Sequence, residues 1–226
     1  MCFSAEASFI ASGVLAGTGI AISRLPKEKS SVPVALIPAI FATHQLIEGF
    51  IWLEHDHPEP DTITRAVVFA YVLIAFILWP AYIPFAASRL ESDPRRRQWM
   101  RFLQVAGLGV GLGYLLSILR SPVAVQVDAC SLSYSVVAPG WFFIPYMAAV
   151  SLPFLLSSQR GLVYFGMAVV ISCAAATYFA SLPAFPSVWC FFAAFMSASL
   201  YAYFRNAARC VTEQPEPNIF SRPRMS

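Results

Sequence analysis

Charged residues are scarce in this sequence of 226 residues. Only 12% of the residues are charged, whereas 58% are hydrophobic. A soluble domain usually carries about 25% charged residues, so the composition excludes an ordinary soluble protein. The net charge of +3 arises from an uneven distribution of basic residues among the connections. We therefore expect no nucleic-acid partner.

Lysine and histidine are also scarce, and this excludes several kinds of membrane protein. The only lysines, Lys27 and Lys29, lie in a connection between apolar runs, which excludes a retinal Schiff base in the last helix. The three histidines, His44, His55 and His57, fall in one short stretch. This excludes a haem held by histidines of two helices, and a zinc site of the ceramidase type, which needs a histidine pair in the last helix. No C-x-x-C motif indicates a zinc or redox site.

Long apolar runs fill most of the chain, and runs of about 20 residues indicate membrane-spanning helices. A lipid-facing backbone must satisfy its own hydrogen bonds, which favours helices. The sequence predicts an all-α bundle of seven transmembrane helices over residues 1–210, followed by a disordered cytoplasmic tail over 211–226. The predicted spans are roughly 4–23, 32–54, 63–88, 99–119, 139–157, 161–181 and 185–205.

The distribution of basic residues predicts the orientation of this bundle. Thirteen of the 15 Lys and Arg residues fall in alternate connections and the tail, and two fall on the other side. Cytoplasmic connections carry an excess of Lys and Arg, so we expect the N-terminus outside and the C-terminus in the cytoplasm. The 13 residues are Arg24, Lys27, Lys29, Arg89, Arg95, Arg96, Arg97, Arg101, Arg160, Arg205, Arg209, Arg222 and Arg224; the other two are Arg65 and Arg120.

Small residues, prolines and cysteines give further local expectations. The four-residue spacing of Gly13 and Gly17, repeated in the glycines at 107–113, favours close helix packing within the bundle. Pro80 predicts a distortion inside the third span.

The connection over 120–138 is either a lid over the outer mouth or an ordinary connector. Three cysteines at or near the outer face allow three disulfide pairings in an oxidising compartment: Cys2, Cys130 and Cys190.

One stretch of the second span, FATHQLIEGFIWLEHDH at 41–57, is unusually polar for a membrane helix. At about 100° per residue, His44, Gln45, Glu48 and Trp52 share one face, which we expect to point into the bundle. A charged side chain at the centre of a spanning helix costs about 2.5–3.5 kcal/mol, so such residues indicate function.

The start of the chain adds polar groups at the same predicted depth. If the first two spans pack together, Cys2 and Glu6 could line one outward-opening cavity with His44 and Glu48. We predict a metal- or proton-dependent site for a small or lipid-like ligand. Its residues are Glu48 and Cys2 for catalysis, Ser4, Glu6, Gln45 and Trp52 for lining the ligand site, and Cys2, His44 and Glu48 for a divalent transition metal as the candidate cofactor.

Two other functions fit the same residues. The chain could be a transporter or channel in which Glu48 is the protonatable group. It could also be a sensor or accessory subunit in which Glu48 and Gln45 only clamp neighbouring helices, with His44 as a satisfied core imidazole. The residues do not decide whether the protein is an enzyme.

Two motifs in the first quarter of the chain stand out. The chain begins Met-Cys-Phe-Ser, at Met1 to Ser4, and its second span carries Gln-x-x-Glu-Gly-x-x-Trp, at Gln45, Glu48, Gly49 and Trp52. In both motifs the sequence resembles a family of bacterial multi-helix membrane proteins of unknown function. The resemblance implies a multi-pass protein of the bacterial inner membrane, with the bilayer as its partner. The family admits Gln at the position of His44, which favours Cys2, Gln45 and Glu48 as the site residues.

Overall fold

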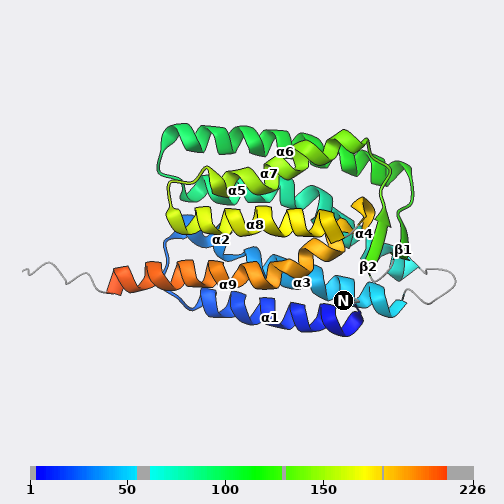
Figure 1. Ribbon diagram of the computed structural model, residues 1–226, viewed down its shortest axis with the longest axis horizontal. Coiled ribbons are helices and arrows are strands. Elements are labelled where there is room, and N and C mark those ends of the chain that lie inside the picture. Colours follow the sequence, from blue (N-terminus) through cyan, green and yellow to red (C-terminus); the bar gives the residue numbers. More distant parts are fainter. Residues whose placement is uncertain (1–3, 55–61, 129–130, 180, 213–226) are drawn as a thin grey trace, which may run out of the picture.

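The computed structural model is a bundle of helices aligned along one axis, with a short β-hairpin at one end (Figure 1). It describes residues 4–54, 62–128, 131–179 and 181–212. The predicted tail lies outside these residues from 213 onward. The α-helices are α1 (Ala5–Ser23), α2 (Val32–Ala35), α3 (Ile37–Glu54), α4 (Thr62–Leu73), α5 (Trp79–Leu90), α6 (Pro94–Arg120), α7 (Phe143–Leu155), α8 (Arg160–Phe179) and α9 (Phe185–Thr212).

Six helical segments in the described part of the chain are long and apolar enough to cross a membrane. The prediction of a helical, multi-pass membrane protein is confirmed at this level. The run predicted at 139–157 is different, because its helix covers only Gly140–Leu155. The six segments are Ala5–Ser23, Lys29–Glu54, Thr62–Leu90, Pro94–Arg120, Arg160–Tyr178 and Phe185–Arg209.

The two ends of the bundle differ in charge. The hairpin end, where α1 starts and the hairpin lies (Figure 1), carries Arg65 and Arg120 at helix termini. The opposite end, which we call the basic end, carries the other described Lys and Arg residues, including Lys27 and Arg97. This separation agrees with the alternation of basic connections along the sequence.

The segment Thr62–Leu90 is not a uniform α-helix. A π-helical turn, η2 (Ile74–Leu78), separates α4 from α5, and the Trp79 N–H bonds to the Ile74 carbonyl. Continuing that register would pair Ala75 with Pro80, which has no N–H to donate. The Tyr146 hydroxyl of α7 donates to the Ala75 carbonyl instead, at 2.7 Å. The predicted distortion at Pro80 is thus a π turn stabilised by a neighbouring helix.

The connection over 120–138 contains two strands that the all-α prediction missed. Strands β1 (Ala124–Asp128) and β2 (Ser131–Ser135) pair antiparallel, with Gln126 opposite Ser133. The first four residues of β2 are buried, and Leu132 and Tyr134 join a hydrophobic cluster with residues of α3, α4 and α6. The connection therefore packs over the hairpin end of the bundle. This agrees with the first of its two predicted roles, a lid, rather than with an ordinary connector.

Glycines make close helix contacts in α6 but not where we expected them in α1. A Cβ on Gly107 would lie 1.9 Å from the Pro80 carbonyl oxygen, and one on Gly111 would lie 3.3 Å from Ile77. A Cβ on Gly13 or Gly17 would meet nothing within 4 Å. The prediction that Gly13 and Gly17 pack within the bundle is wrong, because both lie on its outer surface.

A hydrogen-bonded network ties two connections together at the basic end. The Glu91 carboxylate accepts from the Ser158 N–H at 2.7 Å, the Ser158 hydroxyl at 2.6 Å and the Asp93 N–H at 2.9 Å. The Arg97 guanidinium donates to the Glu91 carbonyl at 2.6 and 2.9 Å. Burial alone would raise the pKa of Glu91, but the hydrogen bonds from Ser158 and Asp93 outweigh it and hold the pKa below the usual 4.5.

Candidate functional site

Helix α3 turns its polar stripe into the bundle, as the sequence predicts. His44, Gln45 and Glu48 are each at most 1% exposed, whereas Leu46 and Phe50 on the opposite face are about half exposed. The stripe therefore lies where α3 packs against α4 and α9 rather than lipid. Three polar side chains are thus sequestered deep inside a membrane-compatible bundle.

Both ring nitrogens of His44 are occupied. Its Nε2 lies 3.1 Å from the Tyr71 carbonyl, and its Nδ1 lies 3.1 Å from the Cys190 sulfur. A carbonyl can only accept, so Nε2 carries the proton and Nδ1 accepts from the Cys190 thiol. This assignment makes His44 a neutral imidazole fixed between α4 and α9, with no lone pair left for a metal.

The carboxyl of Glu48 is only half satisfied. Its Oε2 accepts from the Gln45 amide at 2.8 Å. Its Oε1 is buried and has no hydrogen-bond partner in the described part of the chain, although the side chains of Tyr71 and Ser187 lie beside the carboxyl. Buried polar atoms are nearly always hydrogen-bonded in native proteins, so this one calls for an explanation.

Three more hydroxyl oxygens around this carboxyl are in the same situation. Tyr71 Oη, Tyr134 Oη and Ser187 Oγ are buried without a hydrogen-bond partner among the described residues. The Tyr71 ring stacks on the His44 ring on one side and on the Tyr134 ring on the other, with centroids 4.1 and 4.3 Å apart. We call Gln45, Glu48, Tyr71, Tyr134 and Ser187 the Glu48 cluster. Its members come from α3, α4, β2 and α9.

Aromatic side chains close the Glu48 cluster toward both ends. Toward the basic end, one turn along α3, Phe41 stacks on Trp79 at 4.1 Å and meets Trp189 edge-on at 6.2 Å. Toward the hairpin end, Tyr134 of β2 covers it. Burial raises the pKa of the Tyr134 phenol well above 10, and so does the nearby Glu48 carboxyl. The phenol therefore keeps its proton and remains a hydrogen-bond donor.

A cavity of about 120 Å³ at the hairpin end of the bundle is lined in part by Tyr134. Besides Tyr134 it is lined by two further tyrosines, Tyr114 and Tyr146, and by Pro139 and Gly140 at the start of the segment leading to α7. Tyr134 thus belongs both to the lining of this cavity and to the Glu48 cluster.

The predicted residues at the start of the chain do not join this site. Ser4 caps α1 by accepting from the Ala7 N–H at 3.3 Å. Glu6 is exposed in the first turn, so it shares no cavity with the buried Glu48. Cys2 lies outside the described residues. Trp52 is half-buried and packs on the cluster that contains Tyr71 and Tyr134.

The described residues bear on the predicted metal site and on the cysteines considered for a disulfide. No group of three potential metal ligands occurs among the described residues, and His44 has no free nitrogen. The part of the metal prediction that needs Cys2 stays untested. Cys190, one of the three cysteines considered for a disulfide, is a free thiol buried against His44. Cys130 lies outside the described residues.

Sequence reasoning missed Tyr71, Tyr134, Ser187 and Cys190 as parts of this site. Ser187 and Cys190 stand three residues apart and so share a face of the last span, which was a usable signal. Tyr71 gave none, because a tyrosine within an apolar run is equally typical of ordinary core packing. Tyr134 gave none either, because it lies in the connection over 120–138, far along the chain from the second span.

Comparison with known proteins gives a family but no activity. The profile of a family of unknown function (DUF6629) matches residues 1–215, so the chain belongs to that family. The match extends far beyond the N-terminal motifs and agrees with the expected resemblance to an uncharacterised family. No curated protein and no solved structure matches the chain.

Proposed function

We propose that this member of the DUF6629 family is a proton-coupled membrane transporter in which Glu48 carries the proton. The observation that supports this most strongly is the grouping of three hydroxyls at one buried carboxyl. Tyr71 and Ser187 lie beside the Glu48 carboxyl and Tyr134 lies beside Tyr71, yet neither their hydroxyls nor Glu48 Oε1 makes a well-formed hydrogen bond among the described residues. The four groups neighbour one another, so small shifts can pair them in more than one way. A site that exchanges protons needs donors and acceptors that can change partners.

The arrangement supports entry of the proton from the hairpin end. Tyr134 lines the cavity at the hairpin end, and its ring stacks on that of Tyr71. Tyr71 in turn lies beside Glu48. Rotation of the two hydroxyls, with water from the cavity, completes a path from the hairpin end to the carboxyl. The layer of Phe41, Trp79 and Trp189 blocks the path toward the basic end.

A carboxyl reached from one side and closed from the other describes one state of an alternating-access cycle. In this proposal the second state opens the aromatic layer and releases the proton at the basic end, which is cytoplasmic in the predicted orientation. The transported partner is a small polar solute or monovalent cation that contacts the free oxygens of the Glu48 cluster. A metal-dependent reaction receives less support, because both nitrogens of His44 are engaged.

The test is proton movement into proteoliposomes that contain a pH-sensitive dye. A membrane potential or an inward gradient of sodium, ammonium, a neutral amino acid or a sugar is imposed in turn. We expect wild type to acidify or alkalise the lumen in at least one condition. Glu48→Gln keeps the hydrogen-bonding capacity and cannot exchange a proton, so it should reduce the signal to that of protein-free liposomes.

Two tyrosine variants make the test specific. Tyr134→Phe keeps the ring stack and removes the hydroxyl, so it should slow proton movement. Tyr164→Phe changes an exposed tyrosine of α8 and should leave it unchanged. Proton movement by a folded Glu48→Gln variant at the wild-type rate would refute the proposal. The absence of proton movement by wild type in every condition would also refute it. If Glu48→Gln were then as stable as wild type, the residue would serve to hold neighbouring helices together.

A further inference from the structure

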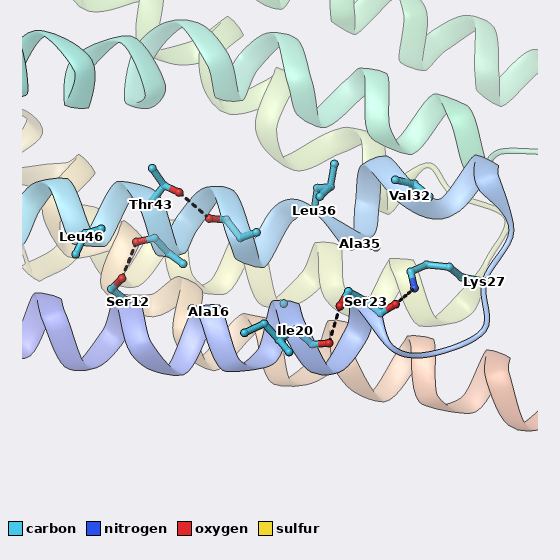
Figure 2. A pocket seen from close by; sticks show the side chains of 13 residues that line it. Ser12, Ala16, Ile20, Ser23, Lys27, Val32, Ala35, Leu36, Thr43 and Leu46 are labelled. Carbon is cyan, nitrogen blue, oxygen red and sulfur yellow. Dashed lines mark hydrogen bonds between the residues drawn. The ribbon is translucent and has the colours of Figure 1, made fainter.

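A long groove runs along the outer surface of the bundle between α1 and the α2–α3 segment (Figure 2). Its volume is about 490 Å³. The floor is made of small residues such as Ala16, Gly19 and Ala39, and a Cβ on Gly19 would lie only 3.5 Å from Ala39. Large apolar side chains that are about half exposed form the rim: Ile20, Leu36 and Leu46.

The hydroxyl groups in the groove do not offer their protons to a ligand. Ser12 donates to the Ala42 carbonyl at 2.8 Å, Thr43 to the Ala39 carbonyl at 3.1 Å and Ser23 to the Ile20 carbonyl at 2.8 Å. Figure 2 shows these bonds along the length of the groove. The wall is therefore apolar in character and suits a hydrocarbon chain.

Among the described residues that line the groove, the one cation is Lys27, at one end. The Lys27 ammonium donates to the Ser23 carbonyl at 2.8 Å and to the Leu25 carbonyl at 2.7 Å. These bonds hold it at the mouth of the groove, at the basic end (Figure 2). An ammonium group has three donors, so one donor and the positive charge remain for an anion.

The length of the groove matches one leaflet of a bilayer. It extends along α1 from Ser12 to Ser23, which at 1.5 Å per residue is about 16 Å. The hydrocarbon core of a bilayer is about 30 Å thick. The groove thus ends near the bilayer centre and opens at the headgroup level, where Lys27 lies.

We infer that this groove binds one acyl chain of an anionic phospholipid from the leaflet at the basic end, with the lipid phosphate on the Lys27 ammonium. Basic pockets between transmembrane helices are known to bind anionic headgroups. A helix of a second copy fits less well, because a helix with side chains is about 10–12 Å across and would not be limited to one leaflet. The inference is independent of proton transport, since the groove is lined by none of the Glu48 cluster.

The test counts lipids bound to the detergent-purified full chain by native mass spectrometry. The protein is mixed with phosphatidylglycerol and phosphatidylcholine of identical acyl chains. We expect one tightly bound phosphatidylglycerol, favoured about fivefold, the effect of one basic residue near anionic lipid. Lys27→Gln should abolish the preference. Lys29→Gln removes the same charge from an exposed neighbour that does not line the groove, and it should retain the preference.

A second pair of variants tests the acyl-chain part. Ala39→Phe fills the groove and should weaken binding of both lipids, whereas Ala174→Phe, at an exposed alanine of α8, should not. The Lys27 comparison stands even if Ala39→Phe does not fold. An unchanged preference in Lys27→Gln, or full binding by folded Ala39→Phe, would overturn the inference. The inference would also be overturned if wild type formed a dimer without bound lipid and the Ala39→Phe variant were monomeric, because a second copy would then occupy the groove.

Discussion

The two bonds of His44 define what this residue can do. With Nε2 donating to the Tyr71 carbonyl and Nδ1 accepting from Cys190, the imidazole is a neutral bridge between α3, α4 and α9. It therefore positions Tyr71 beside Glu48 and does not itself ligate a metal. A glutamine at this position would also offer both a donor and an acceptor group.

The thiol of Cys190 should accordingly contribute to stability. Cys190→Ala leaves the buried Nδ1 of His44 without a donor, and we expect a loss of about 1–3 kcal/mol in the free energy of unfolding. Cys190→Ser keeps a hydroxyl donor and should lose less. Thermal unfolding in detergent measures both. Equal stability of the alanine and serine variants would show that the sulfur makes no useful hydrogen bond.

How far the sequence predicted this site depends on the kind of residue. A 100° rotation per residue sufficed to place His44, Gln45 and Glu48 on the buried face of α3, because the pattern is local. Tyr134 and Cys190 reach the same point from segments about 90 and 145 positions away, and no local pattern encodes such a meeting. The expected cavity with Glu6 failed for a related reason: the depth of a residue does not reveal which way its helix faces.

Among the helices, the close contact between α6 and the segment Thr62–Leu90 depends on glycine, which has no side chain. The Pro80 carbonyl occupies the space where a Cβ on Gly107 would lie. Gly109, two residues along α6, has nothing within 4 Å of its Cβ position. The two glycines therefore have different roles although both follow the same sequence spacing.

Alanine substitution should separate these roles. Gly107→Ala must push backbone apart, and overpacking of this kind costs about 1–3 kcal/mol. Gly109→Ala adds a methyl group on the open side of a helix, where alanine is the better helix former. We expect a lower melting temperature for the first variant and an equal or higher one for the second. Equal losses from both would contradict the close approach at Pro80.

The hydrogen bonds to the Glu91 carboxylate should make the stability of the protein depend on pH. Its carboxyl has a pKa below the usual 4.5 in the folded protein, so the stabilisation is fully present above pH 4.5. It is lost as the pH falls through the lower, folded-state pKa. We expect Glu91→Gln to be less stable than wild type at pH 6, with the difference shrinking below pH 4.5.

Melting temperatures measured from pH 3 to pH 7 provide this comparison. Glu28→Gln is the control at the same end of the bundle, because its exposed carboxylate bonds only to the Ser30 hydroxyl within the described chain, and such surface contacts contribute little. A Glu91→Gln deficit that stays constant across this range would show that its charge is not the stabilising feature.

For the molecule as a whole, the separation of charge predicts how the bundle sits in a membrane. Basic connections face the cytoplasm, so we expect the basic end inside and the hairpin outside. A reporter enzyme that is active only in the cytoplasm should work when fused after Ser92 and fail when fused after Ser121. The reverse pattern would place the cavity at the hairpin end on the cytoplasmic side.

The composition and the lengths of the apolar runs sufficed to predict a multi-pass helical protein, because apolar runs of about 20 residues are typical of membrane-spanning helices. The hairpin was missed although Val125 and Val127 alternate with polar residues, as do Leu132 and Tyr134. The run predicted at 139–157 is a shorter apolar helix, Gly140–Leu155, than the other six, because an apolar run does not show where a helix begins.

The π turn at Ile74–Leu78 also sets the rotational phase between the two halves of its helix. It accommodates one residue more than the same number of α-helical turns, and one residue corresponds to about 100° of rotation. Tyr71 lies before this extra residue, and Trp79 lies after it. Deleting a single residue there would straighten the helix, yet Tyr71 and Trp79 could no longer both reach α3. Tyr71 of the Glu48 cluster and Trp79 of the aromatic layer thus owe their alignment to one irregular turn, and its unwinding would rotate one against the other.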